Sequence, residues 1–273
     1  MEEKKVTGSK VRKREERAGR FMGRYMLECC VDSVESAIAA EEGGADRLEL
    51  CAALVTGGIS PGLALFEQVR ECCGLPVRVL LRPRFGDFLY TKYEFAVLKR
   101  EAELFREKGA EGIVIGCLKE DGNLHLERMK ELIQAADGMK ITLHRAFDVC
   151  ANPIAVYEQA GELGIDTILT SGQKSNCLAG MPLLKRLAEL QKKNGGPQIM
   201  AGAGVTPDVI RQFLADTDIT SFHLSAKKVI DSSMRYRKED VPMGLPMMSE
   251  YHIFRTDSQV VAEARKVLEE MER

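Results

Sequence analysis

Polar side chains stand at the ends of several short apolar runs, in a pattern that suits chemistry. Glu28 precedes Cys30 by two residues, and Glu49 precedes Cys51 in the same way. Carboxylates can transfer protons, and thiolates bind soft metal ions. Other runs end in guanidinium, imidazole, hydroxyl or glycine-rich groups: Arg82-Pro83-Arg84, His144-Arg145-Ala146-Phe147-Asp148, Thr170-Ser171-Gly172, Gly202-Ala203-Gly204 and His223-Leu224-Ser225. The chain therefore predicts one site assembled from many strand ends.

The apolar runs predict eight strands separated by helices. We place the strands near residues 25–31, 45–51, 76–82, 112–116, 139–146, 166–171, 197–201 and 219–225. Their ends lie 20 to 34 residues apart, the length of a strand and a crossover helix, so the strands should be parallel. Eight such units in about 250 residues favour a single-domain (β/α)8 TIM barrel. An open doubly wound sheet is the alternative, and it would require a reversal of strand order.

Two helices are marked clearly in the sequence. Asp32-Ser33-x-Glu35 resembles a helix start and predicts a helix over 33–42. Residues 257–271 predict a terminal helix, because apolar residues recur there at helical spacing. These residues are Val260, Val261, Ala264, Val267 and Leu268.

Successive side chains of a strand point to opposite faces, which sorts the candidate residues. The apolar set of each strand should face the helices. The other set should then point into the barrel lumen: Glu28, Cys30, Glu49, Cys51, Arg82, His144 and His223. Buried carboxylates need cations or donors, and Arg82 and the two histidines are the expected partners. A polar plug that only stabilises the barrel is the alternative interpretation.

The candidate residues divide into two chemical groups. Catalytic acid–base roles suit Glu28, Glu49, His144, Asp148 and His223. Anion-binding roles suit Arg82, Arg84, Arg145, Thr170, Ser171, Gly202, Gly204 and Ser225. Glycines let the backbone approach a ligand, and barrels often bind phosphate beside strands seven and eight. We therefore expect an anion near Arg82 or the Gly202–Gly204 loop, with His144 within reach.

Cysteine spacing leaves the question of a metal open. The chain has no CxxC, CxxxC or HxxxH, so zinc-finger and metalloprotease spacings are absent. Cys30 and Cys51 are predicted at matching positions on adjacent strands, facing the lumen. Two thiolates placed in this way could bind a soft ion such as Cu(I). The alternative is that both are buried thiols that act as small hydrophobic residues.

Composition fits a soluble, single-domain cytosolic protein. The 273 residues include 45% hydrophobic and 29% charged residues, with no membrane-length apolar run and no signal-peptide pattern. Eight cysteines without such a pattern favour reduced thiols. Residues 1–24 carry nine Lys/Arg against four Glu, so this segment is +5 and the remainder −7. We expect a disordered basic arm over 1–24, a barrel over 25–273, and neither nucleic acid nor membrane as a partner.

Several strings resemble the CutC copper homeostasis protein family. They are Met26-Leu27-Glu28-x-Cys30-Val31-Asp32-Ser33, Gly43-Gly44-Ala45-Asp46-Arg47-x-Glu49-Leu50-Cys51, Arg82-Pro83-Arg84, Gly86-Asp87-Phe88-Leu89-Tyr90, His144-Arg145-Ala146-Phe147-Asp148 and Leu169-Thr170-Ser171-Gly172. The resemblance covers about residues 25–255 in unchanged order. It implies a cytoplasmic (β/α)8 barrel, a homodimer, a role in copper homeostasis and Cu(I) binding. Phe85 departs from the family pattern, in which a glycine is usual, and the basic arm is not a shared feature.

Two functions are consistent with these residues. The first is Cu(I) binding by Cys30 and Cys51. The second is an enzyme, a lyase, isomerase or hydrolase, acting on a small phosphorylated or carboxylated substrate. No organic cofactor is indicated. The first predicts that the thiols matter most, and the second that the carboxylates and arginines do.

Overall fold

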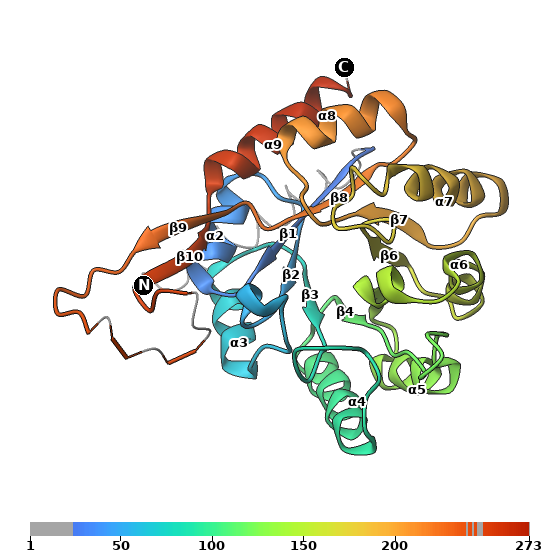
Figure 1. Ribbon diagram of the computed structural model, residues 1–273, viewed down its shortest axis with the longest axis horizontal. Coiled ribbons are helices and arrows are strands. Elements are labelled where there is room, and N and C mark those ends of the chain that lie inside the picture. Colours follow the sequence, from blue (N-terminus) through green and yellow to red (C-terminus); the bar gives the residue numbers. More distant parts are fainter. Residues whose placement is uncertain (1–23, 239, 242, 245–247, 273) are drawn as a thin grey trace, which may run out of the picture.

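Eight parallel strands form a closed barrel, in chain order, and the first pairs with the last (Figure 1). The computed structural model describes residues 24–238, 240–241, 243–244 and 248–272. The strands are β1 (Met26–Val31), β2 (Arg47–Leu50), β3 (Val77–Leu80), β4 (Gly112–Ile115), β5 (Lys140–Leu143), β6 (Thr167–Thr170), β7 (Gln198–Ala201) and β8 (Ser221–Leu224). Each lies within its predicted range. The predicted barrel is therefore confirmed, and the open sheet is wrong.

Helices cover the outside of the barrel (Figure 1). They are α2 (Val34–Glu42), α3 (Leu63–Cys72), α4 (Lys92–Glu107), α5 (Leu126–Ala136), α6 (Pro153–Glu162), α7 (Met181–Asn194), α8 (Pro207–Asp216) and α9 (Ser258–Glu270). Short 3-10 turns follow two strands, at η2 (Leu54–Thr56) and η3 (Arg145–Val149). Residues 1–23 lie outside the described part of the chain, and so does almost all of the predicted basic arm.

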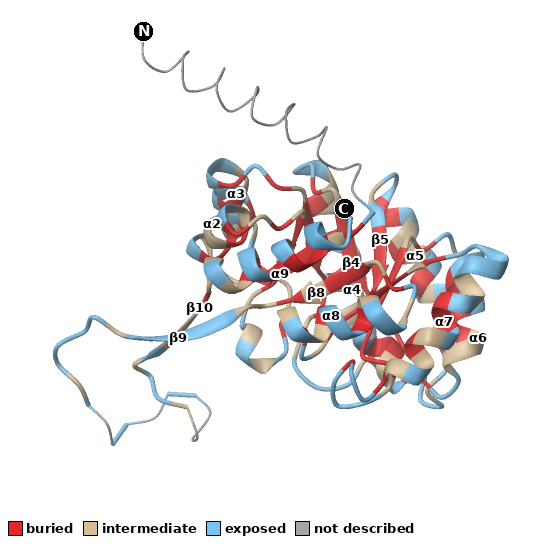
Figure 2. Cartoon of the chain, turned by 90° about the horizontal axis from the view of Figure 1, so that it is seen from above, coloured by how far each residue is buried: buried red, intermediate tan, exposed pale blue. Residues whose placement is uncertain are grey.

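Alternating faces of the strands separate two interiors, as predicted. Leu27, Cys29 and Val31 of β1 belong to the apolar layer between strands and helices, whereas Glu28 and Cys30 do not. The buried strands form the centre of the molecule (Figure 2). Glu28 and Cys30 therefore point into the lumen, as the alternation predicts.

Both predicted helices are present. Ser33 caps α2, because its side chain accepts a hydrogen bond from Ser36 N. The predicted terminal helix is α9, which buries Val261, Ala264, Val267 and Leu268 and packs on α2, α8 and β1. The contact with α2 is close at Gly43, where an added Cβ would lie 2.5 Å from Val261 Cβ and 2.7 Å from Ser258 O.

A two-stranded antiparallel ribbon was not predicted. It consists of β9 (Lys227–Asp231) and β10 (His252–Thr256), which pair with each other and not with the barrel. The ribbon extends away from the barrel (Figures 1 and 2). Its base is attached through Thr256, whose backbone N–H donates to Ser36 Oγ at 3.1 Å.

Gly43 provides a test of how tightly α9 closes the barrel. Gly43→Ala should lower the free energy of unfolding by about 1–3 kcal/mol, because overpacking forces α9 outward. The matched control is Gly161→Ala, within α6. The nearest atom to its added Cβ would be Pro197 Cδ, at an ordinary contact distance of 3.7 Å. The control should be neutral or slightly stabilising, since alanine favours helix. Equal urea-unfolding midpoints for the two variants would contradict the tight contact.

Candidate functional site at the barrel mouth

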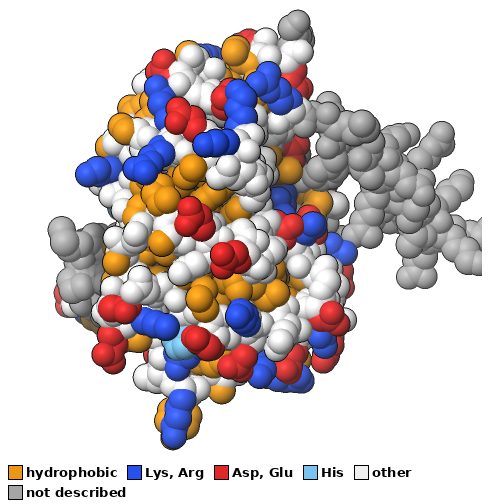
Figure 3. Space-filling view, turned by 90° about the vertical axis from the view of Figure 1, so that its right-hand side faces the viewer, with side chains coloured by type: hydrophobic (Ala, Val, Ile, Leu, Met, Phe, Trp, Pro, Cys, Tyr) orange, Lys and Arg blue, Asp and Glu red, His pale blue; other side chains and the backbone are white. Residues whose placement is uncertain are grey.

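The outer surface offers no concentration of one charge on the side shown in Figure 3. There, basic and acidic side chains are interspersed with hydrophobic ones. The carboxyl ends of the strands instead border a cavity of about 640 Å³. Nine predicted site residues line it: Cys30, Glu49, Arg82, His144, Arg145, Asp148, Gly204, His223 and Ser225. Strand ends from all around the barrel therefore meet at one place, as the spacing predicts.

The two lumen cysteines are adjacent. Their sulfur atoms are 3.8 Å apart, and Cys30 Sγ lies 3.4 Å from Glu49 Oε1. The prediction of matching positions is wrong, because β1–β2 register pairs Cys30 with Glu49. Cys51 follows the end of β2, and its backbone N–H donates to Val31 O. The stagger of strands in a closed barrel brings the sulfurs together despite the offset.

Cys51 lies beside Cys30 but outside the cavity lining. It is fully buried and packs with Cys30, Leu80 and Val114 in a small apolar cluster separate from the main core. Its thiol donates to Val31 O at 3.6 Å. Cys30 reaches the cavity, so an ion entering from the mouth would meet this sulfur first.

Glu49 and His223 complete a group of potential metal ligands. One ligand atom from each of Cys30, Glu49 and His223 lies within 4.8 Å of the others. Glu49 is 4% exposed, and its Oε2 has no hydrogen-bond partner among the described residues. Burial raises the pKa of Glu49, and the hydrogen bond to Cys51 together with burial raises that of Cys30. Both groups are thus biased toward their protonated forms.

A buried ion pair lies immediately below this group. Arg47 Nε is 2.5 Å from Glu28 Oε2, and His223 Nδ1 is 2.8 Å from Glu28 Oε1. Burial by itself raises the pKa of Glu28, but Arg47 and His223 outweigh it and lower the pKa to about 2. Burial disfavours the charged imidazole of His223, yet Glu49 and Glu28 outweigh it and raise its pKa. Glu28 is therefore ionised, and it orients His223 with Nε2 left for the ligand group.

The partners of the carboxylates differ in part from expectation. His223 does pair with Glu28, but the arginine that does so is Arg47 and not Arg82. Arg78 lies deeper in the lumen and donates to Thr142 Oγ1 at 2.7 Å and to Thr167 Oγ1 at 3.2 Å. Neither arginine was predicted to lie in the lumen, although each precedes a lumen residue of its own strand by two positions. Strand parity alone would have found them.

The predicted anion-binding groups on β6 already hold a carboxylate of the chain itself. Asp148 accepts from Thr170 Oγ1 at 2.5 Å, and from the backbone N–H of Ser171 at 3.0 Å and of Gln173 at 3.3 Å. Arg145 Nε donates to the same carboxylate at 2.7 Å. Asp148, Arg145, Thr170 and Ser171 are thus brought together, as predicted, but they satisfy one another.

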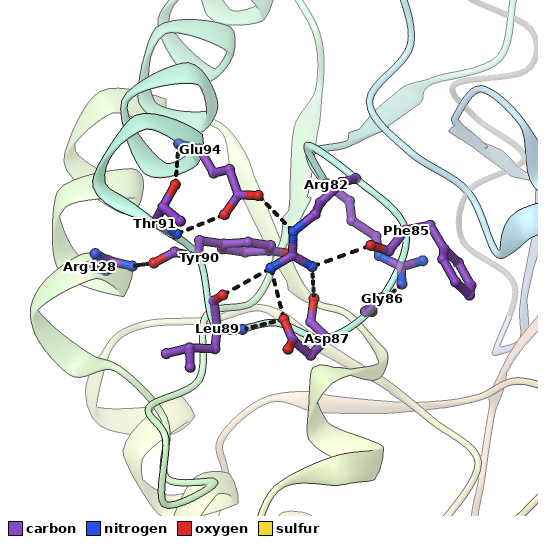
Figure 4. A network of polar contacts seen from close by, with 10 residues as sticks. Arg82, Phe85, Gly86, Asp87, Leu89, Tyr90, Thr91, Glu94 and Arg128 are labelled. Carbon is purple, nitrogen blue, oxygen red and sulfur yellow. Dashed lines mark hydrogen bonds and ion pairs between the residues drawn. The ribbon is translucent and has the colours of Figure 1, made fainter.

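Arg84 is similarly occupied, and Figure 4 labels its partners Glu94, Asp87 and Leu89 around the loop after β3. Its Nε donates to Glu94 at 2.6 Å, its Nη2 donates to Asp87 at 2.9 Å, and further bonds reach loop carbonyls. Glu94 also forms a capping box with Thr91 at the start of α4. Arg84 therefore anchors the loop after β3 to α4. Phe85 causes no backbone strain, because only Gly86 in this loop has a positive φ, of 107°.

Six predicted site residues lie outside the cavity lining: Glu28, Cys51 and Arg84, described above, and Thr170, Ser171 and Gly202. Thr170 and Ser171 face Asp148, and Gly202 donates its N–H to Thr170 O at 2.9 Å. An added Cβ on Gly202 would lie 2.5 Å from Leu169 Cδ1, so this glycine permits close packing of β6 on β7. Gly204, by contrast, lines the mouth with φ of 76°.

Comparison with known proteins identifies relatives over most of the chain. The CutC family model matches residues 25–228. A family protein CutC of Erwinia tasmaniensis is 41% identical over 243 residues, covering 89% of this chain and 95% of that one. The human Copper homeostasis protein cutC homolog is 42% identical over 234 residues, covering 85% of each.

Solved structures agree with the fold. A CutC crystal structure from Streptococcus agalactiae has a TM-score of 0.68 and 25% identity, covering 74% of this chain and 98% of that one. Thiamine phosphate pyrophosphorylase from Pyrococcus furiosus has a TM-score of 0.53 at 16% identity, covering 91% of this chain and 98% of that one. The second likeness shows the barrel alone.

Removing the Glu28 carboxylate tests the buried ion pair. Glu28→Gln should lower the free energy of unfolding by about 3–5 kcal/mol, because Arg47 would remain buried without a counter-charge. The folded-state pKa of Glu28 is depressed from 4.5 to about 2, so its stabilisation is present above about pH 4.5. It is lost as the pH falls toward 2. The difference between wild type and variant should therefore shrink over that range.

The matched control is Glu127→Gln, at a side chain that is 71% exposed and whose partners are His125, at 3.2 Å, and Lys119, at 4.0 Å. It should change stability by less than about 0.5 kcal/mol. Urea denaturation at several pH values measures both variants. An effect of Glu28→Gln no larger than that of the control would show that the pair is not stabilising.

Proposed function

The chain belongs to the CutC family, and from that premise we propose that it binds Cu(I) at the barrel mouth, through Cys30 and Cys51. The observation that carries the proposal is the 3.8 Å separation of their sulfur atoms, one of which, Cys30 Sγ, belongs to a residue that lines the mouth. The human relative is named a copper homeostasis protein. The family's role in copper homeostasis indicates that the ion is copper, and the two thiols are the proposed ligands.

The donor set fits a soft cation. Metal–thiolate bonds are about 2.3 Å long, as measured for zinc, so two sulfurs 3.8 Å apart can bind the same ion. Thiolate and imidazole donors favour Cu(I) over magnesium or calcium, which prefer oxygen. His223 is the third donor, and the unpartnered Oε2 of Glu49 lies beside the group.

Residues behind these donors hold them in position. Histidines that bind metals usually donate the other ring N–H to a carboxylate, which fixes the ring orientation. Glu28 plays this part for His223, at 2.8 Å. Arg47 in turn keeps Glu28 ionised. The two thiols lie in a cluster with Leu80 and Val114, which excludes water from the sulfur side.

Three further expectations from the sequence stay predictions. They are a cytoplasmic location, a homodimer, and the second function, an enzyme acting on a small anion. Within the described part of the chain, no helix combines the length and apolarity needed to cross a bilayer.

Cu(I) titration of reduced protein tests the thiol pair. Wild type should bind about one equivalent against a competing chelator. Cys30→Ser and Cys51→Ser should each lose most of that binding, because each removes one of two soft ligands. Cys72→Ser is the matched control, since Cys72 is an exposed thiol distant from the mouth. Retention of wild-type affinity by the Cys30→Ser, Cys51→Ser double variant would rule the site out.

The affinity for Cu(I) should rise with pH. The raised pKa values of Cys30 and His223 mean that both sites retain protons at lower pH, which the ion must displace. Each displaced proton contributes roughly tenfold in affinity per pH unit below the relevant pKa. Between pH 6 and pH 8 the dissociation constant of wild type should fall by roughly 100-fold or more. A flat profile would contradict proton displacement at this site.

A further inference from the structure

The barrel mouth has a second side that Cu(I) binding does not use. We propose that it contains a subsite for a small oxyanion, carboxylate or phosphate, which accepts a hydrogen bond from His144 Nε2 and lies beside the guanidinium of Arg82. The inference is independent of the proposed copper binding, because it involves neither thiol. Both residues line the cavity that Cys30 and His223 also border.

The hydrogen bonding of His144 fixes which ring nitrogen is the donor. Nδ1 accepts a hydrogen bond from Ala146 N at 3.1 Å, so it carries no proton. The proton of the neutral ring is therefore on Nε2, which makes this atom a donor. Nε2 is buried and has no partner among the described residues, and His144 is only 4% exposed. An unsatisfied buried donor is costly, and an acceptor from a ligand would satisfy it.

Packing directs this donor toward the cavity. An added Cβ on Gly116 would lie 2.6 Å from His144 Cε1 and 2.7 Å from Nδ1, so that edge of the ring is pressed against the strand end. Phe88 covers the ring at a centroid distance of 4.7 Å. The Cδ2 side of the ring therefore lies away from Gly116, on a residue that lines the cavity.

His144 remains neutral at physiological pH. Burial and the charge of Arg82 lower its pKa to about 3. The ring is thus a neutral hydrogen-bond donor of fixed tautomer. A neutral imidazole donor suits a carboxylate, phosphate or carbonyl oxygen.

Arg82 supplies the charge for an anion. Its Nη atoms donate to three loop carbonyls, of Gly57, Gly58 and Gly86, at 2.7 to 3.3 Å. Carbonyls satisfy the donors but leave the positive charge uncompensated. No carboxylate of the described residues lies within ion-pair distance of Arg82, and its buried Nε has no partner there. A 9%-exposed guanidinium in this state attracts an anion.

Phe88 connects the two groups. Its ring lies 5.1 Å from Arg82 Cζ as well as against His144, so one aromatic side chain packs against both. The cavity volume of about 640 Å³ lies in the range of small-molecule sites and exceeds what one metal ion needs. An organic anion could therefore occupy this side while the thiol side stays open.

Calorimetric titration of the metal-free full-length chain tests the subsite. The probes are inorganic phosphate in one arm, and acetate, malonate and citrate in the other, all at matched ionic strength. At least one arm should show saturable binding together with a raised melting temperature. His144→Leu should weaken that binding by roughly tenfold or more, since the donor is lost while the volume is kept.

Three further variants separate the possible causes. Gly116→Ala should weaken binding in the same way by displacing His144, whereas Cys30→Ser should leave it unchanged. Arg211→Gln is the control for general charge, because this exposed arginine lies on α8 and its ion-pair partner among the described residues is Asp208. Arg82→Gln should abolish anion binding, and circular dichroism checks that this variant is folded. Failure of both arms to bind wild type, or full retention of binding in His144→Leu, would overturn the proposal.

Discussion

The buried ion pair between Glu28 and Arg47 is the constraint on which the rest of the lumen depends. Two charges removed from water destabilise a barrel interior unless each is paired and hydrogen-bonded. Glu28 meets this condition with Arg47 on one oxygen and His223 on the other. The same contacts fix the ring of His223 and hence the direction of its remaining nitrogen. The stability of the interior and the geometry of the mouth therefore both depend on the Glu28 carboxylate.

Above this layer the mouth has two chemically different sides. Thiols, a carboxyl group biased toward protonation and an oriented imidazole lie on the β1, β2 and β8 side. A neutral imidazole donor and an uncompensated guanidinium lie on the β3 and β5 side. The first side suits a soft cation and the second an oxyanion. The β6 end suits neither, because Asp148 already occupies its donors.

Strand spacing and parity predicted the fold and most of the mouth. Glu28, Cys30, Glu49 and His223 followed from alternation on strands whose ends were placed correctly. The register between neighbouring strands could not be predicted, because it depends on how far the strands are staggered in the closed barrel. The two-residue offset between Cys30 and Cys51 was therefore missed. Individual pairings were also beyond the sequence. Arg84 was expected in the site, yet its guanidinium donates to Glu94 and Asp87. The path of the loop brings these two carboxylates close to Arg84, and the sequence does not reveal that path.

Other misses have identifiable physical causes. The β9–β10 ribbon has every residue of β9 exposed, so it lacks the one-sided burial that produces a clear strand pattern. Gly116 carries no chemical group, and its role appears only when the ring of His144 is placed against it. Burial and the charge of Arg82 lower the pKa of His144, an effect that its place in the sequence does not reveal.

X-ray absorption at the copper edge, on protein loaded with one equivalent of Cu(I), tests the central claim most directly. The account predicts a first shell with two sulfur atoms and one lighter donor, contributed by Cys30, Cys51 and His223. Substituting His223 with leucine should remove the lighter scatterer and leave both sulfurs. A first shell without sulfur, or one that is unchanged when Cys30 and Cys51 are both serine, would contradict it.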